Sequence, residues 1–197
     1  SFYGTDNRCM LDALALLNGA GRGIAVLAHD VSSGELHRLH AAGIRGIRIN
    51  LESTSVRDPS AIESLLARWA RKIADHGWHI QVYAAPEIIG ATVEQLAQLP
   101  VATVLDHFAM IPSRADRNDP SLRAVLALLE RGKAYVKLSA PYRISPEPLA
   151  DAERIARLST WLQDANPERI LWGTDWPHTN REPGVGAHEV SRYRDVP

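Results

Sequence analysis

The feature that most constrains the fold is a regular alternation of short apolar runs with longer amphipathic stretches. Six runs are rich in aliphatic and β-branched residues and have the modest length of buried strands. These predicted strands span residues 23–28, 46–50, 79–84, 102–107, 134–139 and 169–175. Because strands alternate with helical patterns along the whole chain, we predict an α/β fold with a parallel sheet covered by helices.

The stretches between the strands carry signals that start and stop helices. An Asp-Pro pair, which supplies an N-cap and a proline at the first helical position, stands at residues 58–59 and again at 119–120. Gly77 and Gly132 follow as C-terminal stops. The predicted helices span residues 10–17, 33–42, 59–76, 92–99, 120–131 and 148–165. Ser1–Tyr3 is predicted to be the stub of a further strand.

Alternation alone does not distinguish an open doubly wound sheet from a barrel. A dinucleotide-binding fold is disfavoured, because no strand is followed by G-x-G-x-x-G or by a P-loop. The glycine-rich segment Gly19–Gly23 precedes a strand, so it is predicted to be a turn. Since no tandem repeat or low-complexity linker interrupts the chain, we expect residues 1–197 to form a single domain.

Composition excludes several classes of function. The net charge of the 197 residues is −1 and no basic stripe is present, which argues against nucleic acid and anionic membranes as partners. No apolar run has the length of a membrane helix, and the first residues do not resemble a secretory signal. Cys9 is the only cysteine, so we expect a reducing, cytoplasmic location. Its position in a helical pattern predicts a core residue rather than a nucleophile.

Several predicted strands end in polar or ionisable side chains, which would face one mouth in a barrel. In chain order these are Arg48 and Asn50, Gln81 and Tyr83, Asp106 and His107, Lys137 and Ser139 followed by Tyr142 and Arg143, and finally Asp175 and His178. Charges at the end of a buried strand are costly unless they serve one another or a ligand. A structural role remains the alternative for any one of them, but several strands together favour a functional site.

This set of residues supports hydrolysis. Asp175 follows the apolar run of the segment R-I-L-W-G-T-D-W-P-H and is placed to take a proton from water as a general base. His107 is predicted to polarise a substrate carbonyl, to hold the water, or to bind a metal. Asp175 and His107 are therefore the predicted catalytic residues.

The remaining candidates are predicted to bind the substrate. Arg48 and Arg143, together with Lys137, are suited to dock carboxylates through paired hydrogen bonds. Tyr83 and Tyr142 are suited to donate hydrogen bonds to substrate oxygens. The balance of these groups predicts an acidic carbonyl substrate, such as an ester, lactone or amide that carries carboxylates.

Six segments of the chain resemble one known family. They are Tyr3–Asn7, Arg22–Val26, Gly43–Asn50, Leu105–His107, Val136–Arg143 and Trp172–His178. In sequence and order they are similar to the amidohydrolase-related family of metal-dependent TIM-barrel hydrolases, and within it to the 2-pyrone-4,6-dicarboxylate lactonase group. The resemblance implies a (β/α)₈ barrel whose last strand carries the catalytic aspartate, Asp175, and whose sixth strand carries a histidine, His107.

The resemblance also implies residues that contact the substrate. Arg143 and Arg48 match substrate-binding arginines of the lactonase group. Tyr83 falls close in sequence to the position of a substrate-contacting tyrosine of that group. His178 fills the position three residues after the aspartate, which contacts substrate in the lactonases.

The chain departs from the family pattern in ways that bear on the barrel. The H-x-H of the family's first strand and its N-P-A-x-L-Y-like ending are absent from the sequence. We therefore expect residues 1–197 to be a fragment of a longer barrel protein that lacks the N-terminal strand and the C-terminal helix. The incomplete barrel is expected to have six to seven strands, whose exposed edges favour pairing such as a homo-oligomer. A basic residue that follows Arg48 in the lactonases is replaced here by the segment L-E-S-T-S, so the docking of carboxylates is expected to differ.

The resemblance leaves the cofactor and the reaction open between alternatives. The resemblance to the lactonase branch implies that no cofactor is required. His107 and Asp175 alone are too few ligands for a catalytic zinc, so we predict no bound metal in this chain. A zinc or manganese ion remains open for a full-length protein. The preferred hypothesis is a hydrolase of a small carboxylated lactone, ester or amide. The alternatives are a metal-dependent decarboxylase of an aromatic or unsaturated acid, and an inactive barrel remnant that acts as a binding or structural protein.

Overall fold

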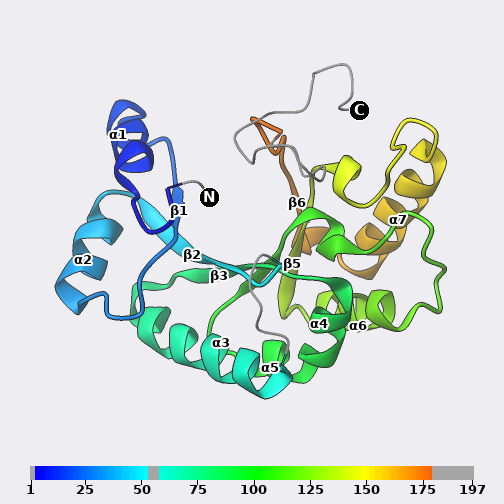
Figure 1. Cartoon of the computed structure of the whole chain (residues 1–197), viewed down its shortest axis with the longest axis horizontal. Helices are drawn as coiled ribbons and strands as arrows, with labels where there is room; N and C mark the ends of the chain where they lie inside the picture. The colour runs from blue at the N-terminus through cyan, green and yellow to red at the C-terminus, as the bar shows by residue number, and fades with distance from the viewer. Residues whose placement is uncertain (1–2, 53–57, 179–197) are drawn as a thin grey trace.

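One parallel sheet organises the part of the chain that the computed structural model describes, which is residues 3–52 and 58–178. Each strand lies parallel to the next one in the sequence, so the spatial order of the strands is their chain order (Figure 1). The strands are β1 (Gly23–Ala25), β2 (Ile44–Asn50), β3 (His79–Tyr83), β4 (Thr103–Leu105), β5 (Ala134–Leu138) and β6 (Ile170–Trp172). A doubly wound sheet would reverse its strand order part-way, whereas an unreversed order is that of a barrel wall.

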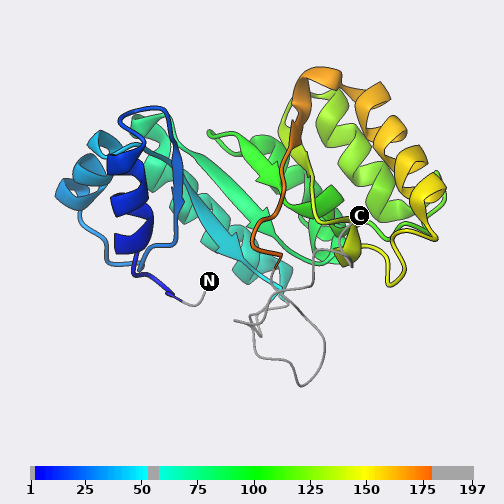
Figure 2. The same ribbon diagram turned by 90° about the horizontal axis from the view of Figure 1, so that it is seen from above.

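The sheet is curled, and helices cover its convex side (Figures 1 and 2). The helices are α1 (Arg8–Leu16), α2 (Ser33–Ala41), α3 (Pro59–Ile73), α4 (Pro86–Ala91), α5 (Val93–Gln98), α6 (Pro120–Glu130) and α7 (Ala152–Ala165). Within the described residues β1 and β6 form the two edges of the sheet, which is therefore a half-barrel. The predicted parallel α/β fold is confirmed at this level.

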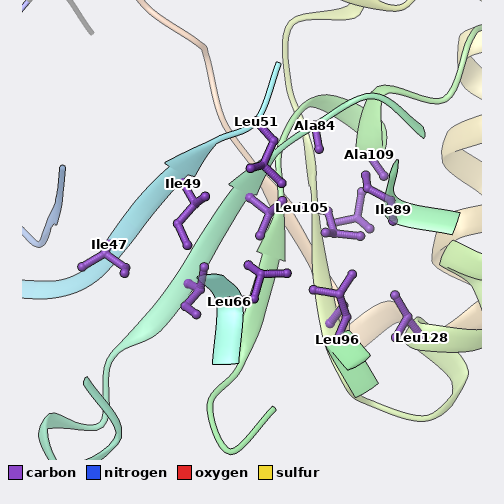
Figure 3. Close-up of a cluster of buried hydrophobic side chains, with 14 of the residues drawn as sticks. Ile47, Ile49, Leu51, Leu66, Ala84, Ile89, Leu96, Leu105, Ala109 and Leu128 are labelled. Carbon is purple, nitrogen blue, oxygen red and sulfur yellow. The ribbon is translucent and has the colours of Figure 1, made fainter. Parts of the chain in front are cut away.

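The main core lies between the convex face of the sheet and the helices. Ile47 and Ile49 of β2 and Leu105 of β4 belong to one buried cluster that also contains Leu66 of α3 and Leu128 of α6 (Figure 3). Side chains alternate between the two faces of a strand, so the residues between these apolar ones face the concave side. On β2 this places the partly exposed Arg48 and Asn50 on the concave face. The fold thus separates an apolar outer core from a polar inner face.

The two helix starts predicted from the Asp-Pro pairs are confirmed. The carboxylate of Asp58 accepts hydrogen bonds from the backbone N–H groups of Ser60 and Ala61 at the start of α3. Asp119 caps α6 in the same way. Each pair satisfies amide groups that have no partner within the helix.

Several predicted boundaries were wrong. β1, β4, β6 and α7 each lack at least three of the residues predicted for them, whereas β2 begins two residues earlier than predicted. The predicted helix over 92–99 is α5 alone, and the unpredicted α4 precedes it because Pro86 opens a helical turn directly after β3. Cys9 is exposed rather than in the core. Of the predicted strand stub Ser1–Tyr3, the first two residues lie outside the described residues and Tyr3 lies in a turn.

No helix among the described residues is long and apolar enough to span a membrane.

Candidate active site

Asp175 lies three residues beyond β6, and two neighbouring side chains donate to the same oxygen of its carboxylate. The Tyr142 hydroxyl lies 2.5 Å from Oδ2, and Nε of Arg143 lies 3.1 Å from it. Burial raises the pKa of Asp175, but the hydrogen bond from Tyr142 and the charge of Arg143 outweigh it, so the pKa lies below its usual value. The carboxylate is therefore ionised at neutral pH.

His107 stands on the other side of that carboxylate. Its Nε2 lies 3.8 Å from Oδ1 of Asp175, and its Nδ1 lies 2.9 Å from the hydroxyl oxygen of Ser139. Burial lowers the pKa of His107 to about 4, even though Asp106 and Asp175 favour the charged form. At neutral pH a neutral imidazole therefore faces an ionised carboxylate, and the two do not form an ion pair.

A left-handed backbone turn delivers His107 to this position. His107, Phe108, Ala109 and Met110 have φ of 51°, 56°, 54° and 56°. Left-handed backbone costs L-residues roughly 1–2 kcal/mol each, and such strain concentrates at functional sites. Phe108 and Ala109 are buried, and their packing against the core offsets part of this cost. The turn ends β4 and explains why the predicted strand did not continue to His107.

Tyr83 connects the two arginines to the histidine. The guanidinium carbons of Arg48 and Arg143 lie 5.0 and 5.9 Å from the centre of its ring. The ring of His107 meets that of Tyr83 edge-on, with the ring centres 5.3 Å apart. Tyr83 is only 5% exposed, so its ring is shielded from solvent where it meets these partners.

Tyr142 and His178 complete the surroundings of Asp175. Burial and the hydrogen bond to Asp175 raise the pKa of Tyr142, which therefore stays a neutral donor. The rings of Tyr142 and His178 pack edge-on with their centres 6.2 Å apart. The backbone N–H of His178 also donates to the carbonyl of Asp175, which closes the turn that carries the aspartate.

Lys137 and Arg48 are held by Asp106, which the sequence placed at a strand end but to which no catalytic or substrate-binding role was assigned. Nζ of Lys137 lies 3.1 Å from Oδ1 of Asp106, and Nε of Arg48 lies 3.1 Å from Oδ2. A signal was present in the sequence, because Leu105 faces the outer core and its neighbour Asp106 must face the concave side. The structure thus brings the eight predicted site residues into one connected cluster, with Asp106 as an added member.

A family model described as amidohydrolase matches residues 1–190. The chain belongs to the amidohydrolase family. A 2-pyrone-4,6-dicarboxylate hydrolase of Comamonas testosteroni is 31% identical over 186 residues, which cover 90% of this chain and 60% of that protein. A 4-sulfomuconolactone hydrolase of Hydrogenophaga intermedia is 28% identical over 181 residues, which cover 91% of this chain and 58% of that protein.

The fold is also similar to that of a solved amidohydrolase relative. A crystal structure from Pseudomonas putida, of a candidate 2-pyrone-4,6-dicarboxylic acid hydrolase, superposes with a TM-score of 0.80 and 32% identity over 94% of this chain and 68% of that chain. This chain spans about three fifths of the length of the two curated relatives.

Amidohydrolases include metal-dependent enzymes, so the donor set near Asp175 bears on a metal. Among the described residues, no group of three or more histidine, cysteine, aspartate or glutamate side chains is arranged to hold a metal ion. His107 and Asp175 supply two donors, whereas catalytic zinc takes three protein ligands. Arg143 already places a cation 3.1 Å from the carboxylate. The described residues alone therefore do not fit a catalytic zinc.

Proposed function

We propose that the protein hydrolyses a small lactone that carries carboxylate or sulfonate groups. The observation that carries this proposal is the pairing of an ionised Asp175 with a neutral, buried His107 beside the guanidinium of Arg143. The named activities of the two curated relatives support the substrate class, since both act on lactones with anionic substituents.

The charges at the mouth favour an anionic substrate. Arg48, Lys137 and Arg143 are three cations, whereas Asp106 and Asp175 are two carboxylates, so their net charge is +1 with His107 neutral. Guanidinium groups bind carboxylates through paired hydrogen bonds. Arg48 and Arg143 lie over one ring, that of Tyr83, which suits them to hold a small ring with anionic groups.

In the proposed reaction Asp175 activates water. Its Oδ2 is occupied by Tyr142 and Arg143, so Oδ1, which faces His107, takes the proton. The hydroxide attacks the lactone carbonyl carbon, and the ring C–O bond breaks. The proton then passes from Asp175 to the departing ring oxygen, so that lactone and water give the hydroxy acid. The aspartate is regenerated as a carboxylate.

His107 has a separate role, which is to polarise the carbonyl. If the Ser139 hydroxyl donates to Nδ1, the imidazole proton sits on Nε2, on the side of Asp175. That N–H then donates to the lactone oxygen as negative charge develops on it. Because the pKa of His107 is about 4, it donates as a neutral imidazole and does not protonate Asp175.

Replacement of the base tests the proposal. Asn tolerates left-handed backbone as Asp does, so Asp175→Asn at φ 55° removes the charge without adding strain. We expect hydrolysis of 2-pyrone-4,6-dicarboxylate or 4-sulfomuconolactone to fall about 10²- to 10⁴-fold, the usual range for a lost general base. Asp164→Asn on the exposed face of α7 is the matched control. Turnover retained by Asp175→Asn, or no hydrolysis of either lactone by the unaltered protein, would contradict the proposal.

A further inference from the structure

Asp106 accepts hydrogen bonds from three strands at once. Its carboxylate accepts hydrogen bonds from Nε of Arg48 on β2 at 3.1 Å, from Nε2 of Gln81 on β3 at 3.0 Å and from Nζ of Lys137 on β5 at 3.1 Å. Asp106 itself directly follows β4. A single buried carboxylate therefore fixes the direction of three donors on the concave face.

The exposure of these groups is unequal. The side chain of Asp106 is fully buried, whereas 24% of the Arg48 side chain and 26% of the Lys137 side chain are exposed. The buried anion thus lies behind the two cations, and among the described residues their remaining N–H groups have no other hydrogen-bond acceptor, so they can bind an anion on the exposed side. Two cations held this close would repel each other without the carboxylate between them.

Tyr83 connects Arg48 to the candidate active site. The Arg48 guanidinium lies 5.0 Å from the centre of the Tyr83 ring, and that ring meets His107 edge-on at 5.3 Å. A shift of Arg48 would therefore disturb both the anion-binding groups and the packing of the catalytic histidine.

We propose that Asp106 is a positioning residue that sets the spacing of Arg48 and Lys137 so that the pair receives one anionic group of the substrate. The inference rests on the proposed function, because it assigns the pair to an anionic lactone. Asp106 does not itself contact the substrate, since its side chain is buried behind the two donors.

Charge and geometry predict opposite effects when Asp106 is replaced. If the carboxylate acted only through its charge, Asp106→Asn would make the site more positive and an anion would bind more tightly. If the carboxylate acts by positioning, the two cations move apart in Asp106→Asn. The N–H₂ group of the introduced asparagine is a donor and does not pair with them, so an anion binds more weakly. Asp106→Glu retains the charge but displaces the carboxylate, so positioning alone predicts weaker binding there too.

The affinity of each variant for a dianion distinguishes the two effects without a measurement of turnover. We would titrate the protein and its variants with pyridine-2,6-dicarboxylate and with the monoanion pyridine-2-carboxylate by calorimetry. We expect Asp106→Asn and Asp106→Glu each to weaken the dicarboxylate at least tenfold, with a smaller effect on the monocarboxylate. Asp119→Asn is the matched control, because Asn caps a helix as well as Asp does.

The selectivity ratio distinguishes positioning from a damaged fold, which would weaken both ligands in parallel. Thermal melting establishes that each variant is folded, and Asp106→Glu, which retains the buried charge, decides the question if Asp106→Asn does not fold. Unchanged or tighter binding of the dianion by Asp106→Glu, a parallel loss of both ligands, or no binding by the unaltered protein would overturn the inference. Dianion binding without lactone hydrolysis would instead contradict the proposed function and leave the role of Asp106 standing.

Discussion

The Tyr142 hydroxyl donates a hydrogen bond of 2.5 Å to Oδ2 of Asp175, the oxygen that also accepts from Arg143. Both donors come from the short 3₁₀ turn Pro141–Arg143, which follows β5, whereas the acceptor follows β6. The contact therefore joins the ends of adjacent strands, and it directs the other carboxylate oxygen toward His107. This turn thus supplies two of the groups that lower the pKa of Asp175.

Tyr142→Phe should move the acid limb of the pH–rate profile to higher pH. The hydrogen bond from Tyr142 lowers the pKa of Asp175, so its loss raises that pKa and the active carboxylate form is reached only at higher pH. The measurement is kcat/KM for lactone hydrolysis from pH 3 to 8. Tyr135→Phe is the control, because Tyr135 contacts Arg169 rather than the aspartate. An acid limb that stays in place, or moves to lower pH, would show that Tyr142 does not set the charge of Asp175.

His107 should make the fold less stable in acid. Its pKa is about 4 in the folded protein against an ordinary value of 6.5, so between these values the unfolded chain binds the proton more readily. Stability is therefore lost as pH falls from 6.5 toward 4, by about 3 kcal/mol in all. His107→Gln should flatten this part of the curve, as measured by urea unfolding at pH 7, 5.5 and 4. The exposed His29→Gln should leave it unchanged, and an equal slope in both variants would contradict the assignment.

Ala109→Gly should cost little stability although Ala109 is fully buried. Loss of the methyl group costs about 0.8 kcal/mol, but glycine adopts φ of 54° without the penalty of roughly 1 kcal/mol that alanine carries there. Ala70 is equally buried within the right-handed helix α3, where glycine adds a further cost of about 1 kcal/mol. Ala70→Gly should thus be destabilised by about 2 kcal/mol more than Ala109→Gly in chemical unfolding. A difference of only about 1 kcal/mol, the helix cost of glycine at Ala70, or less would mean that the left-handed turn carries no strain.

The sequence was sufficient for the parallel α/β class and for the starts of α3 and α6, because strand–helix alternation and helix caps are local signals. The proline after Asp58 and the proline after Asp119 each fix a helix start within a few residues. Strand ends also placed Arg48 and Lys137 on one concave face, since alternation along a strand is strict.

What the sequence did not reveal depends on contacts between distant residues. The left-handed turn that carries His107 contains no glycine, and its conformation is stabilised by the burial of Phe108 and Ala109. Asp106 could be placed on the inner face, but not paired with Arg48, which lies 58 residues away. Such pairings follow from the register of strands, and no local pattern specifies them.

Arg143→Lys should impair catalysis even though it retains the positive charge. The guanidinium makes two contacts from different nitrogens: Nε lies 3.1 Å from Asp175, and Nη1 lies 3.5 Å from the Tyr83 hydroxyl. A lysine ammonium is a single point and does not span both partners. We expect kcat/KM for lactone hydrolysis to fall about ten- to a hundredfold, in line with the cost of ~1.5–3 kcal/mol for a lost hydrogen bond from a charged group.

Arg169→Lys provides the matched comparison for this substitution, because Arg169 stacks on Tyr135 away from Asp175. The two variants should melt within a few degrees of each other, so that the difference in kcat/KM reports on the site rather than on the fold. The pH–rate profile adds a second readout. If lysine continues to pair with Asp175, the acid limb stays near its original position and the loss arises from the Tyr83 side; if the limb moves to higher pH, the pairing itself is broken. Full activity in Arg143→Lys would show that the two contacts from different nitrogens are not required and that the positive charge of residue 143 suffices.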